Sequence, residues 1–416
     1  MKKYDLIVAG GGFAGTAAAI SAARMGASVL IVEKSNCLGG AAVNCLVNPF
    51  MNYFTKKENR IFSLNRGIFE EIHTELEKRN AVKYESFSEE ELKLILNRMV
   101  LKEKIDVLFH SFIFEVNMEN QNIKSVEIVN KSGKTEIEAR YFIDATGDAD
   151  VAYLAGCPCT LGRQQDNLCQ PMTLCFRVGN VDVKKFRSTF SKVNKLYKQY
   201  KCEGKINNPR EDILVFNWES TNNVLHFNTT RIVKRNPVDA WDVTLAELEV
   251  REQVFEIYDF LKKHADGFEE SFLMMTASEI GVRESRMIQG EYILTGDDIR
   301  NCTVFEDSVV AGNYDIDIHN PEGSGTSHYY FPEGAYYTIP YRSLIPKGTD
   351  NLLVAGRCIS SDHEAQASYR IMPIVCCIGE AAGTAIGIAV KDNVKVRDVN
   401  VTALRETLKK NNAFIG

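Results

Sequence analysis

The chain has 416 residues, of which 45% are apolar and 25% charged, and its formal net charge is −6. A chain of this length can bury a large core and hold two domains, and the composition is typical of a folded soluble protein. The acidic balance and the lack of a basic run argue against nucleic-acid binding, and with it against an enzyme that modifies RNA. A strand is predicted almost from Met1, so we expect no signal peptide and a cytoplasmic protein.

The 11 cysteines contain no C-x-x-C pair. The sequence therefore predicts no metal site, and most thiols are expected to be buried and reduced. Residues 371–390 come nearest to a membrane span, with Glu380 as their only charge. Pro373 and the small residues at 381–385 favour a helix packed inside the protein, and we expect no membrane span.

A glycine-rich turn near the start of the chain predicts a dinucleotide site. An apolar strand at 4–9 is followed by Gly10, Gly12 and Gly15 in G-x-G-x-x-G order. In this motif the first glycine permits the turn, the second lets the backbone approach a pyrophosphate, and the third lets the next helix pack on the strand. The N-terminus of that helix then faces the phosphates.

A second strand at 27–32 ends in Glu33. This position lies at roughly the 20-residue offset from the glycines at which an acidic side chain reaches a ribose diol. A carboxylate there accepts hydrogen bonds from both hydroxyls and repels a 2′-phosphate. The alternative is a solvent-exposed glutamate at a strand end, which the glycines upstream make the weaker interpretation.

The next hundred residues predict helices and then short strands. Amphipathic patterns at 66–80 and 88–100 indicate two helices, the second opened by a Ser88–Glu91 capping box. A meander of short strands follows, and a buried strand then leads into Ala145-Thr146-Gly147-Asp148. The meander strands are expected at 107–111, 113–117, 123–130 and 135–139.

From 153 to 340 the alternation of strands and helices is lost, which predicts a second domain. Strands are expected at 173–178, 214–218 and 224–230, and a long helix from 244 to about 263. A dense polar stretch in aromatic surroundings closes this part, and it represents either a network of ion pairs or a polar substrate pocket. Its members are Glu279, Arg283, Glu284, Arg286, Asp297, Asp315, Asp317, His319 and His328.

We expect residues 341–416 to lie again beside the predicted dinucleotide site. A strand at 351–355 ends in the Gly356-Arg357 turn, and a small-residue helix follows. Together the motifs resemble the FAD-dependent oxidoreductases of the glutathione reductase superfamily, nearest the fumarate reductase/succinate dehydrogenase flavoprotein-like branch. They cover nearly the whole chain, at 10–15 with Glu33, 38–40, 145–148, 281–286, 317–319, 339–342, 351–360, 363–372 and 379–383.

The resemblance implies an α/β fold. A Rossmann-like FAD-binding domain, with a parallel sheet and a β-meander, would be built from 1–152 and 341–416. An inserted α+β substrate or cap domain would span 153–340. Only one G-x-G-x-x-G unit opens a βαβ pattern, so no separate NAD(P)H domain is expected.

The resemblance also implies which residues hold FAD. They are Gly10, Gly12, Phe13, Ala14, Gly15, Glu33, Lys34, Leu38, Gly39, Gly40, Ala145, Thr146, Gly147, Asp148, Gly356, Arg357, Gly379, Ala382 and Gly383. Ala42 and Val47 stand where disulfide reductases of the superfamily carry redox cysteines, and no histidine lies beside Gly39-Gly40 to anchor flavin covalently. We therefore predict non-covalent FAD and no dithiol chemistry.

The expected activity is hydride transfer between flavin N5 and a small polar organic substrate. His363 follows the Gly356-Arg357 turn and is the first candidate for handling the proton. Arg370, Arg342 and Arg286 are candidates for binding a carboxylate. The alternative roles are a helix cap for the histidine and ion pairs for the arginines.

If His363 has only a structural role, we expect His319, His328 or Tyr341 to handle the proton instead. Electrons would come from the substrate, from transient contact with NAD(P)H, or from a partner protein. The alternative function is a flavoprotein electron-transfer subunit whose partner carries out the substrate chemistry.

Overall fold

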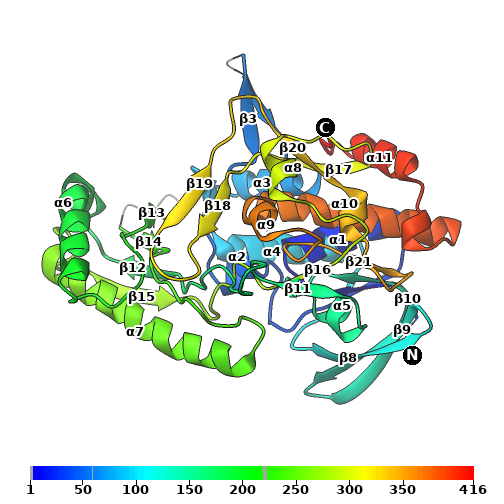
Figure 1. Ribbon diagram of the computed structural model, residues 1–416, viewed down its shortest axis with the longest axis horizontal. Helices are drawn as coiled ribbons and strands as arrows, with labels where there is room; N and C mark the ends of the chain where they lie inside the picture. The colour runs from blue at the N-terminus through cyan, green and yellow to red at the C-terminus, as the bar shows by residue number, and fades with distance from the viewer. Residues whose placement is uncertain (1–2, 59, 219–222) are drawn as a thin grey trace.

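The computed structural model describes residues 3–58, 60–218 and 223–416 (Figure 1). Its main sheet has a parallel part in which the strand order is β7–β2–β1–β10, with β21 pairing on β10. Strands β1, β2 and β21 and the second half of β10 are apolar and largely buried, as in a sheet with both faces covered. Their bounds are β1 Tyr4–Ala9, β2 Val29–Val32, β7 Asp106–Leu108, β10 Gly133–Asp144 and β21 Leu352–Val354.

Strand β10 joins the parallel sheet to the meander. Its first half pairs antiparallel with β9 (Asn122–Asn130), which in turn pairs with β8 (Phe112–Glu119). Its second half pairs in parallel with β1 and β21. The sequence predicted two strands here, at 135–139 and from 141, and the structure has one strand of 12 residues. It also places β7, expected in the meander, beside β2 in the parallel sheet.

Helices α1 (Phe13–Arg24) and α10 (Met372–Asp392) lie against each other, and both contact strands of the main sheet (Figure 1). A Cβ atom at Gly379 would lie 2.0 Å from Ala14 O, and one at Gly383 would lie 2.0 Å from Ala18 O. Only glycine allows this approach. By length and composition α10 could cross a membrane, but 94% of its apolar window is buried in the protein, which identifies it as a core helix.

The cap is an antiparallel sheet in the order β13–β14–β12–β15, with α6 and α7 beside it at the left of Figure 1. Helix α6 was not predicted, although Phe186, Val193 and Tyr197 are buried at helical spacing. Helix α7 begins at Ala240, where Asp239 caps it, and not at residue 244. The bounds are β12 Phe176–Gly179, α6 Val183–Cys202, β13 Val215–Asn217, β14 Leu225–Phe227, α7 Ala240–His264 and β15 Phe272–Thr276.

The remaining elements are short. The strand pairs are β3 Phe54–Lys57 with β4 Arg60–Ser63, β5 Val82–Lys83 with β6 Ser86–Phe87, β11 Cys159–Leu161 with β16 Arg286–Ile288, β17 Ser308–Gly312 with β20 Tyr337–Pro340, and β18 Ile316–His319 with β19 Thr326–Tyr329. The helices are α2 Ala41–Asn44, α3 Ile68–Lys78, α4 Glu89–Lys102, α5 Asp150–Leu154, α8 Gly296–Arg300, α9 His363–Tyr369 and α11 Val401–Lys410, with 3₁₀ turns at Tyr341–Leu344 and Val396–Asp398. The predicted Ser88 cap of α4 is present.

Two hydrophobic clusters divide the protein. The cap cluster draws mainly on residues from Met172 to Ile280. Side chains from Ile288 onward pack instead in the cluster of the main sheet. The change from one cluster to the other therefore falls between Ile280 and Ile288, and the domain boundary expected from the sequence at residue 340 stays a prediction.

A buried carboxylate joins α10 to α3. Glu380 Oε2 accepts a hydrogen bond from the backbone N–H of Ile68, 3.0 Å away, at the first residue of α3. Burial raises the pKa of Glu380 to about 7 from its ordinary 4.5, and the nearby charge of Glu71 adds to the rise. The folded protein thus holds this proton more tightly than the unfolded chain does.

Stability should therefore fall with rising pH in a window set by Glu380. Its contribution is fully present below pH 4.5 and is lost as the pH rises through 7. The loss amounts to at most about 3 kcal/mol of unfolding free energy. Glu380→Gln keeps an acceptor for Ile68 and should flatten this slope in urea unfolding, while Glu70→Gln on the surface should not. An unchanged slope in Glu380→Gln would place the pH dependence elsewhere.

Candidate functional site

A cavity of about 900 Å³ opens between the carboxyl end of the main sheet and the cap. One end is lined by glycine-rich turns that follow the strands of the sheet. The other end is lined by polar side chains from the cap, from the β18–β19 strand pair and from the segment between α9 and α10. The two ends belong to one continuous space, so a ligand held at the turns can meet a second ligand at the polar end.

The turn after β1 has the geometry that its glycines predict. Gly10 has φ +93°, and a Cβ atom there would lie 2.5 Å from Ala145 O. At Gly15 a Cβ atom would lie 1.9 Å from Gly10 O, so the helix can pack on the turn only with glycine in place. Gly12 is the N-cap residue of α1 and supplies no side-chain cap. The first N–H groups of α1 are thus left for a ligand, which is the property of an anion site at a helix N-terminus.

Glu33 lies at the end of β2 and lines the same cavity. It is only 5% exposed, which rules out the solvent-exposed alternative. Its carboxylate accepts hydrogen bonds from the N–H groups of Gly11 at 2.5 Å and Ser35 at 2.7 Å. These contacts hold the carboxylate beside the glycine turn.

A second glycine turn faces the first. The backbone N–H of Gly39 donates to Gly11 O at 2.8 Å, and a Cβ atom at Gly40 would lie 2.9 Å from Gly12 Cα. The turns after β10 and β21 complete this end, where Arg357 forms an ion pair with Asp148 at 2.6 Å. Arg357 Nε is buried without a hydrogen-bond partner.

Most residues expected to hold FAD line the cavity. They are Gly10, Gly12, Phe13, Ala14, Glu33, Lys34, Gly39, Gly40, Ala145, Thr146, Gly147, Asp148, Gly356 and Arg357. Gly15, Leu38, Gly379, Ala382 and Gly383 do not. Gly15 and Leu38 pack behind the glycine turn, and the other three lie in α10, whose glycines pack against α1.

Asp317 is the centre of the polar end. Its Oδ2 atom receives Tyr314 Oη at 3.2 Å, His319 Nε2 at 3.2 Å and Arg370 Nη2 at 3.4 Å. Although burial opposes ionisation, His319, Arg370 and Arg283 hold the pKa of Asp317 well below its usual range. Asp317 Oδ1 and Arg370 Nη1 are buried and have no hydrogen-bond partner.

The tautomer of His319 follows from its neighbours. Arg231 Nη2 lies 3.2 Å from His319 Nδ1, and because a guanidinium only donates, Nδ1 must accept. The ring proton is then on Nε2, where it points to Asp317. Burial, with the charge of Arg283, holds the pKa of His319 well below its usual value. The ring is therefore neutral, and both its nitrogen atoms are engaged.

Arg283 lines the cavity without a counter-ion. It donates to Pro171 O at 2.7 Å, Thr173 Oγ1 at 2.5 Å and Asn228 Oδ1 at 3.2 Å. Across the described ranges no carboxylate lies within ion-pair distance of it. Burial, together with the charges of Arg370 and Arg231, lowers the pKa of Arg283 to about 9. Arg283 remains a cation at neutral pH.

Three side chains expected in the chemistry lie outside the cavity lining. His363 Nδ1 is 2.7 Å from Oε1 of the buried Glu284. Arg286 pairs with Asp150, and Arg342 pairs with Asp307 at 2.9 Å on the surface. Each of these two arginines is already paired with a carboxylate outside the cavity lining. Their contacts therefore agree with the alternative role in ion pairs. His363 is not the cap of α9 either, since Asp362 fills that position.

Of the other residues expected in the chemistry, some line the cavity and some do not. His319, His328 and Arg370 line the cavity. Tyr341 is buried and donates to Val396 O at 2.7 Å, away from the lining. The sequence had placed Arg283 only within the polar stretch, and Tyr314 was not singled out. The signal for Arg283 was its position in the 281–286 motif.

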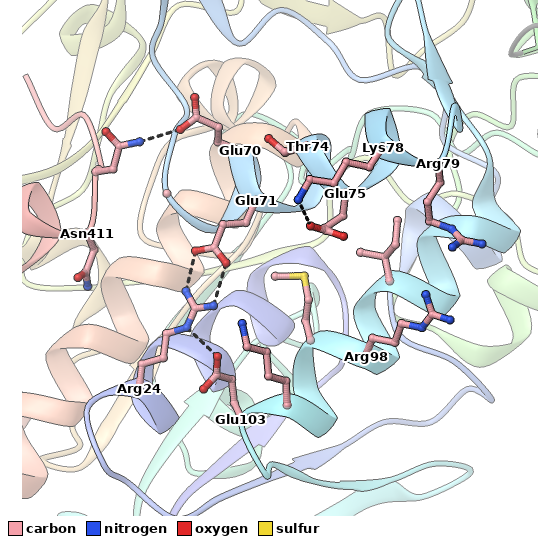
Figure 2. A pocket seen from close by; sticks show the side chains of 15 residues that line it. Arg24, Glu70, Glu71, Thr74, Glu75, Lys78, Arg79, Arg98, Glu103 and Asn411 are labelled. Atoms are coloured by element: carbon pink, nitrogen blue, oxygen red, sulfur yellow. Dashed lines mark hydrogen bonds and ion pairs between the residues drawn. The ribbon is translucent and has the colours of Figure 1, made fainter.

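A second hollow, of about 810 Å³, lies between α3 and α4 (Figure 2). Arg24 bridges its walls, with two contacts to Glu71 at 2.7 and 2.8 Å and one to Glu103 at 3.0 Å. Glu75 pairs with Lys78 at 2.7 Å. The labelled charges in this hollow mostly face one another, and none of the expected site residues lines it, so we assign it no chemistry.

Neither a metal site nor a disulfide is built into the described part of the chain. No group of three or more His, Cys, Asp or Glu side chains there is arranged to hold a metal ion. All 11 cysteines are free, and most are buried. Burial raises the pKa of Cys45 to about 12 and likewise that of Cys175 to about 12, so these two thiols in the cavity lining stay protonated.

Comparison with known proteins gives a family and a fold. A family model described as FAD dependent oxidoreductase matches residues 5–408. The digeranylgeranylglycerophospholipid reductase of Thermoplasma acidophilum is 27% identical over 196 residues, which are 44% of this chain and 48% of that protein. The soluble pyridine nucleotide transhydrogenase of Mycobacterium tuberculosis is 50% identical over 44 residues, 11% of this chain and 9% of that protein. The chain thus spans about half the length of the first relative and less of the second.

Solved structures share the fold at low identity. A geranylgeranyl bacteriochlorophyll reductase-like protein from Thermoplasma acidophilum has a TM-score of 0.50 at 14% identity, covering 99% of this chain and 84% of that one. The p-nitrophenol 4-monooxygenase of Pseudomonas putida has a TM-score of 0.50 at 10% identity, covering 100% and 94%. At such identities the likeness concerns the fold alone.

The contact between His363 and Glu284 predicts a structural role for the histidine. His363→Ala should remove one of two hydrogen-bond partners of the buried Glu284 carboxylate, which keeps the N–H of Gln170 at 2.8 Å, and should lower the unfolding free energy by roughly 1–3 kcal/mol. The double variant His363→Ala/Glu284→Gln should recover part of that loss, because the remaining side chain is then uncharged. Chemical denaturation of the wild type and of these two variants checks this. Unchanged stability combined with lost turnover would return His363 to the chemistry.

Proposed function

Since the chain belongs to the family of FAD dependent oxidoreductases, we propose that it transfers a hydride between flavin N5 and a small organic anion bound at the cap end of the cavity. The observation that carries this proposal is the single cavity, which joins an uncapped helix N-terminus at one end to the uncompensated Arg283 at the other. We also propose membership of the glutathione reductase superfamily, on its fumarate reductase-like branch, and a cytoplasmic location.

The residues at the glycine-rich end fit FAD. The first turn of α1 would bind the pyrophosphate, and the buried Glu33 would accept hydrogen bonds from the ribose. The Gly39-Gly40 and Gly356-Arg357 turns would flank the flavin, where the unpartnered Arg357 Nε offers a donor. When bound, FAD supplies the two-electron hydride chemistry.

The polar end would bind and orient the substrate. Arg283 would hold a carboxylate, because it is a cation in the cavity lining without a counter-ion, and Arg370 would contact a neutral polar group of the substrate. His319 is neutral with both nitrogens engaged, so it positions Asp317 and does not exchange protons. His328 is the proposed proton carrier, since it lines the cavity and its side chain is 34% exposed.

The proposal is tested by anaerobic reduction of the purified FAD-loaded protein. The panel should contain NADH, NADPH, sugars, hydroxy acids and unsaturated acids. Bleaching of the flavin by a small organic acid supports the proposed enzyme. Bleaching only after addition of a protein partner from the host would favour the electron-transfer subunit, and failure to bind FAD would overturn the assignment of the cavity.

Glu33→Gln should weaken FAD retention. The change removes the charge from the ribose hydrogen bonds, each of which contributes about 1.5–3 kcal/mol when charge-assisted. We expect at least a roughly tenfold rise in the FAD dissociation constant, measured by flavin fluorescence during titration of the apoprotein. The matched control is Glu70→Gln, which removes a carboxylate from the hollow in Figure 2. Equal retention by both variants would contradict the placement of the ribose. Heat or acid should release the flavin intact.

A further inference from the structure

We propose that the substrate of this cavity is a hydroxycarboxylic acid, a molecule that carries one carboxylate and a hydroxyl group. The carboxylate would pair with Arg283, and the hydroxyl would bridge Asp317 and Arg370. This inference rests on the proposed function for the location of the substrate. It adds the chemical class.

The first step is the charge balance at the polar end. Arg370 pairs with Asp317 at 3.4 Å, and His319 is neutral. The two arginines behind them have their own carboxylates, Arg231 with Glu211 at 3.3 Å and Arg210 with Asp212 at 3.0 Å. Arg283 alone in this cluster has hydrogen bonds only to uncharged groups. A buried charge is costly without a partner, so the cluster favours a ligand with a single negative charge.

The second step is the pair of unpartnered atoms. Asp317 Oδ1 accepts no hydrogen bond, although His328 Nδ1 lies 3.7 Å from it, and Arg370 Nη1 is a donor without an acceptor. Both belong to one ion pair whose residues line the cavity. Each atom is shielded from water, and an unpaired buried polar atom costs about 1–3 kcal/mol. The terminal torsion of an aspartate is soft, so a small rotation can turn Oδ1 toward a ligand.

A hydroxyl group satisfies both atoms at once. It donates its hydrogen to Asp317 and accepts from Arg370 through its oxygen. An ammonium group only donates, and it would leave Arg370 Nη1 unpaired while adding a positive charge beside Arg283. A keto oxygen only accepts, and it would leave Asp317 Oδ1 unpaired. The hydroxyl therefore fits better than either group.

Hydrogen bonds of the backbone and of two side-chain amides hold Arg283 and the strand of Asp317 in fixed relative positions. Gln366 Nε2 donates to Arg283 O at 2.7 Å, and Gln170 Nε2 donates to Gln366 Oε1 at 3.2 Å. Gln170 Oε1 in turn accepts from the backbone N–H of His319 at 3.2 Å. Arg283 is thus linked through two buried amides to the strand that carries Asp317. The anion site and the hydroxyl site are parts of one rigid arrangement.

The test measures binding to the FAD-loaded protein by isothermal titration and by the shift of the flavin spectrum. The probes are matched pairs, lactate with propionate and 3-hydroxybutyrate with butyrate, together with alanine and lactamide. At least one hydroxy acid should bind about tenfold or more tightly than its deoxy partner, the effect of one charge-assisted hydrogen bond. Alanine and lactamide should bind more weakly than lactate.

Two variants assign the contributions. Asp317→Asn should bring the affinities for a hydroxy acid and its deoxy partner close together, whereas Arg283→Gln should weaken both. The matched control Arg79→Gln lies in the hollow of Figure 2 and should change neither affinity. The wild-type comparison stands even if a variant fails to fold.

Equal binding of each hydroxy acid and its deoxy partner would overturn the inference, as would tighter binding of alanine or lactamide, or no binding of any acid. Reduction of the flavin by a substrate without a hydroxyl would also overturn it and leave the proposed function standing. A chain that binds no FAD would overturn the proposed function itself.

Discussion

The closeness with which the first helix approaches its neighbours sets the geometry of the whole protein. Gly10, Gly15 and Gly379 meet backbone atoms at distances where a Cβ atom would clash. These contacts fix α1 between the end of β10 and the middle of α10. The first turn of α1 is thereby held at the wall of the cavity, and the N–H groups proposed to bind the pyrophosphate are positioned by backbone packing that no side-chain rotation can alter.

The opposite wall is organised by charge. Asp317 gathers a tyrosine, a neutral histidine and an arginine on one oxygen, and Arg231 fixes the histidine tautomer from behind. Buried polar groups stabilise a single arrangement only when nearly all of them are paired. On this wall the buried atoms without a hydrogen-bond partner are Asp317 Oδ1 and Arg370 Nη1, and both residues line the cavity. A protein surface that needed only stability would favour apolar side chains at these positions.

Local sequence patterns predicted the parts of the site that local geometry decides. The glycine turn, Glu33 and the Ala145–Asp148 turn each follow directly from a strand and its exit, and each lines the cavity. His363, the first candidate for handling the proton, contacts Glu284 outside the cavity lining, because position in the chain says nothing about the direction of a side chain once a helix begins. Its role in the chemistry stays a prediction. Arg283 and Asp317 line the same cavity only because of the tertiary packing, and no spacing in the sequence records that they share it.

For the fold as well, the sequence predicted the features that local patterns decide. The parallel strands and α10 were recognisable from apolar runs, whereas the length of β10 depends on a change of partner halfway along it. The side chains change from one hydrophobic cluster to the other before Ile288, because loss of strand–helix alternation does not mark a change of core, and the domain boundary expected at 340 stays a prediction. Helix α6 has apolar residues at helical spacing, but its many lysines make that pattern weak, and the helix was not predicted.

The pairing of α1 with α10 has a consequence for biosynthesis. The glycine turn leaves the ribosome early, but the helix that packs under it follows more than three hundred residues later, and so does β21. At about 5–20 residues per second this delay lasts tens of seconds. During translation α1 and its neighbouring strands must wait with an apolar face uncovered, which is a period when chaperones can bind them. The glycine turn gains its full packing only after α10 has been made, so under the proposed function FAD would be loaded late in the maturation of this protein.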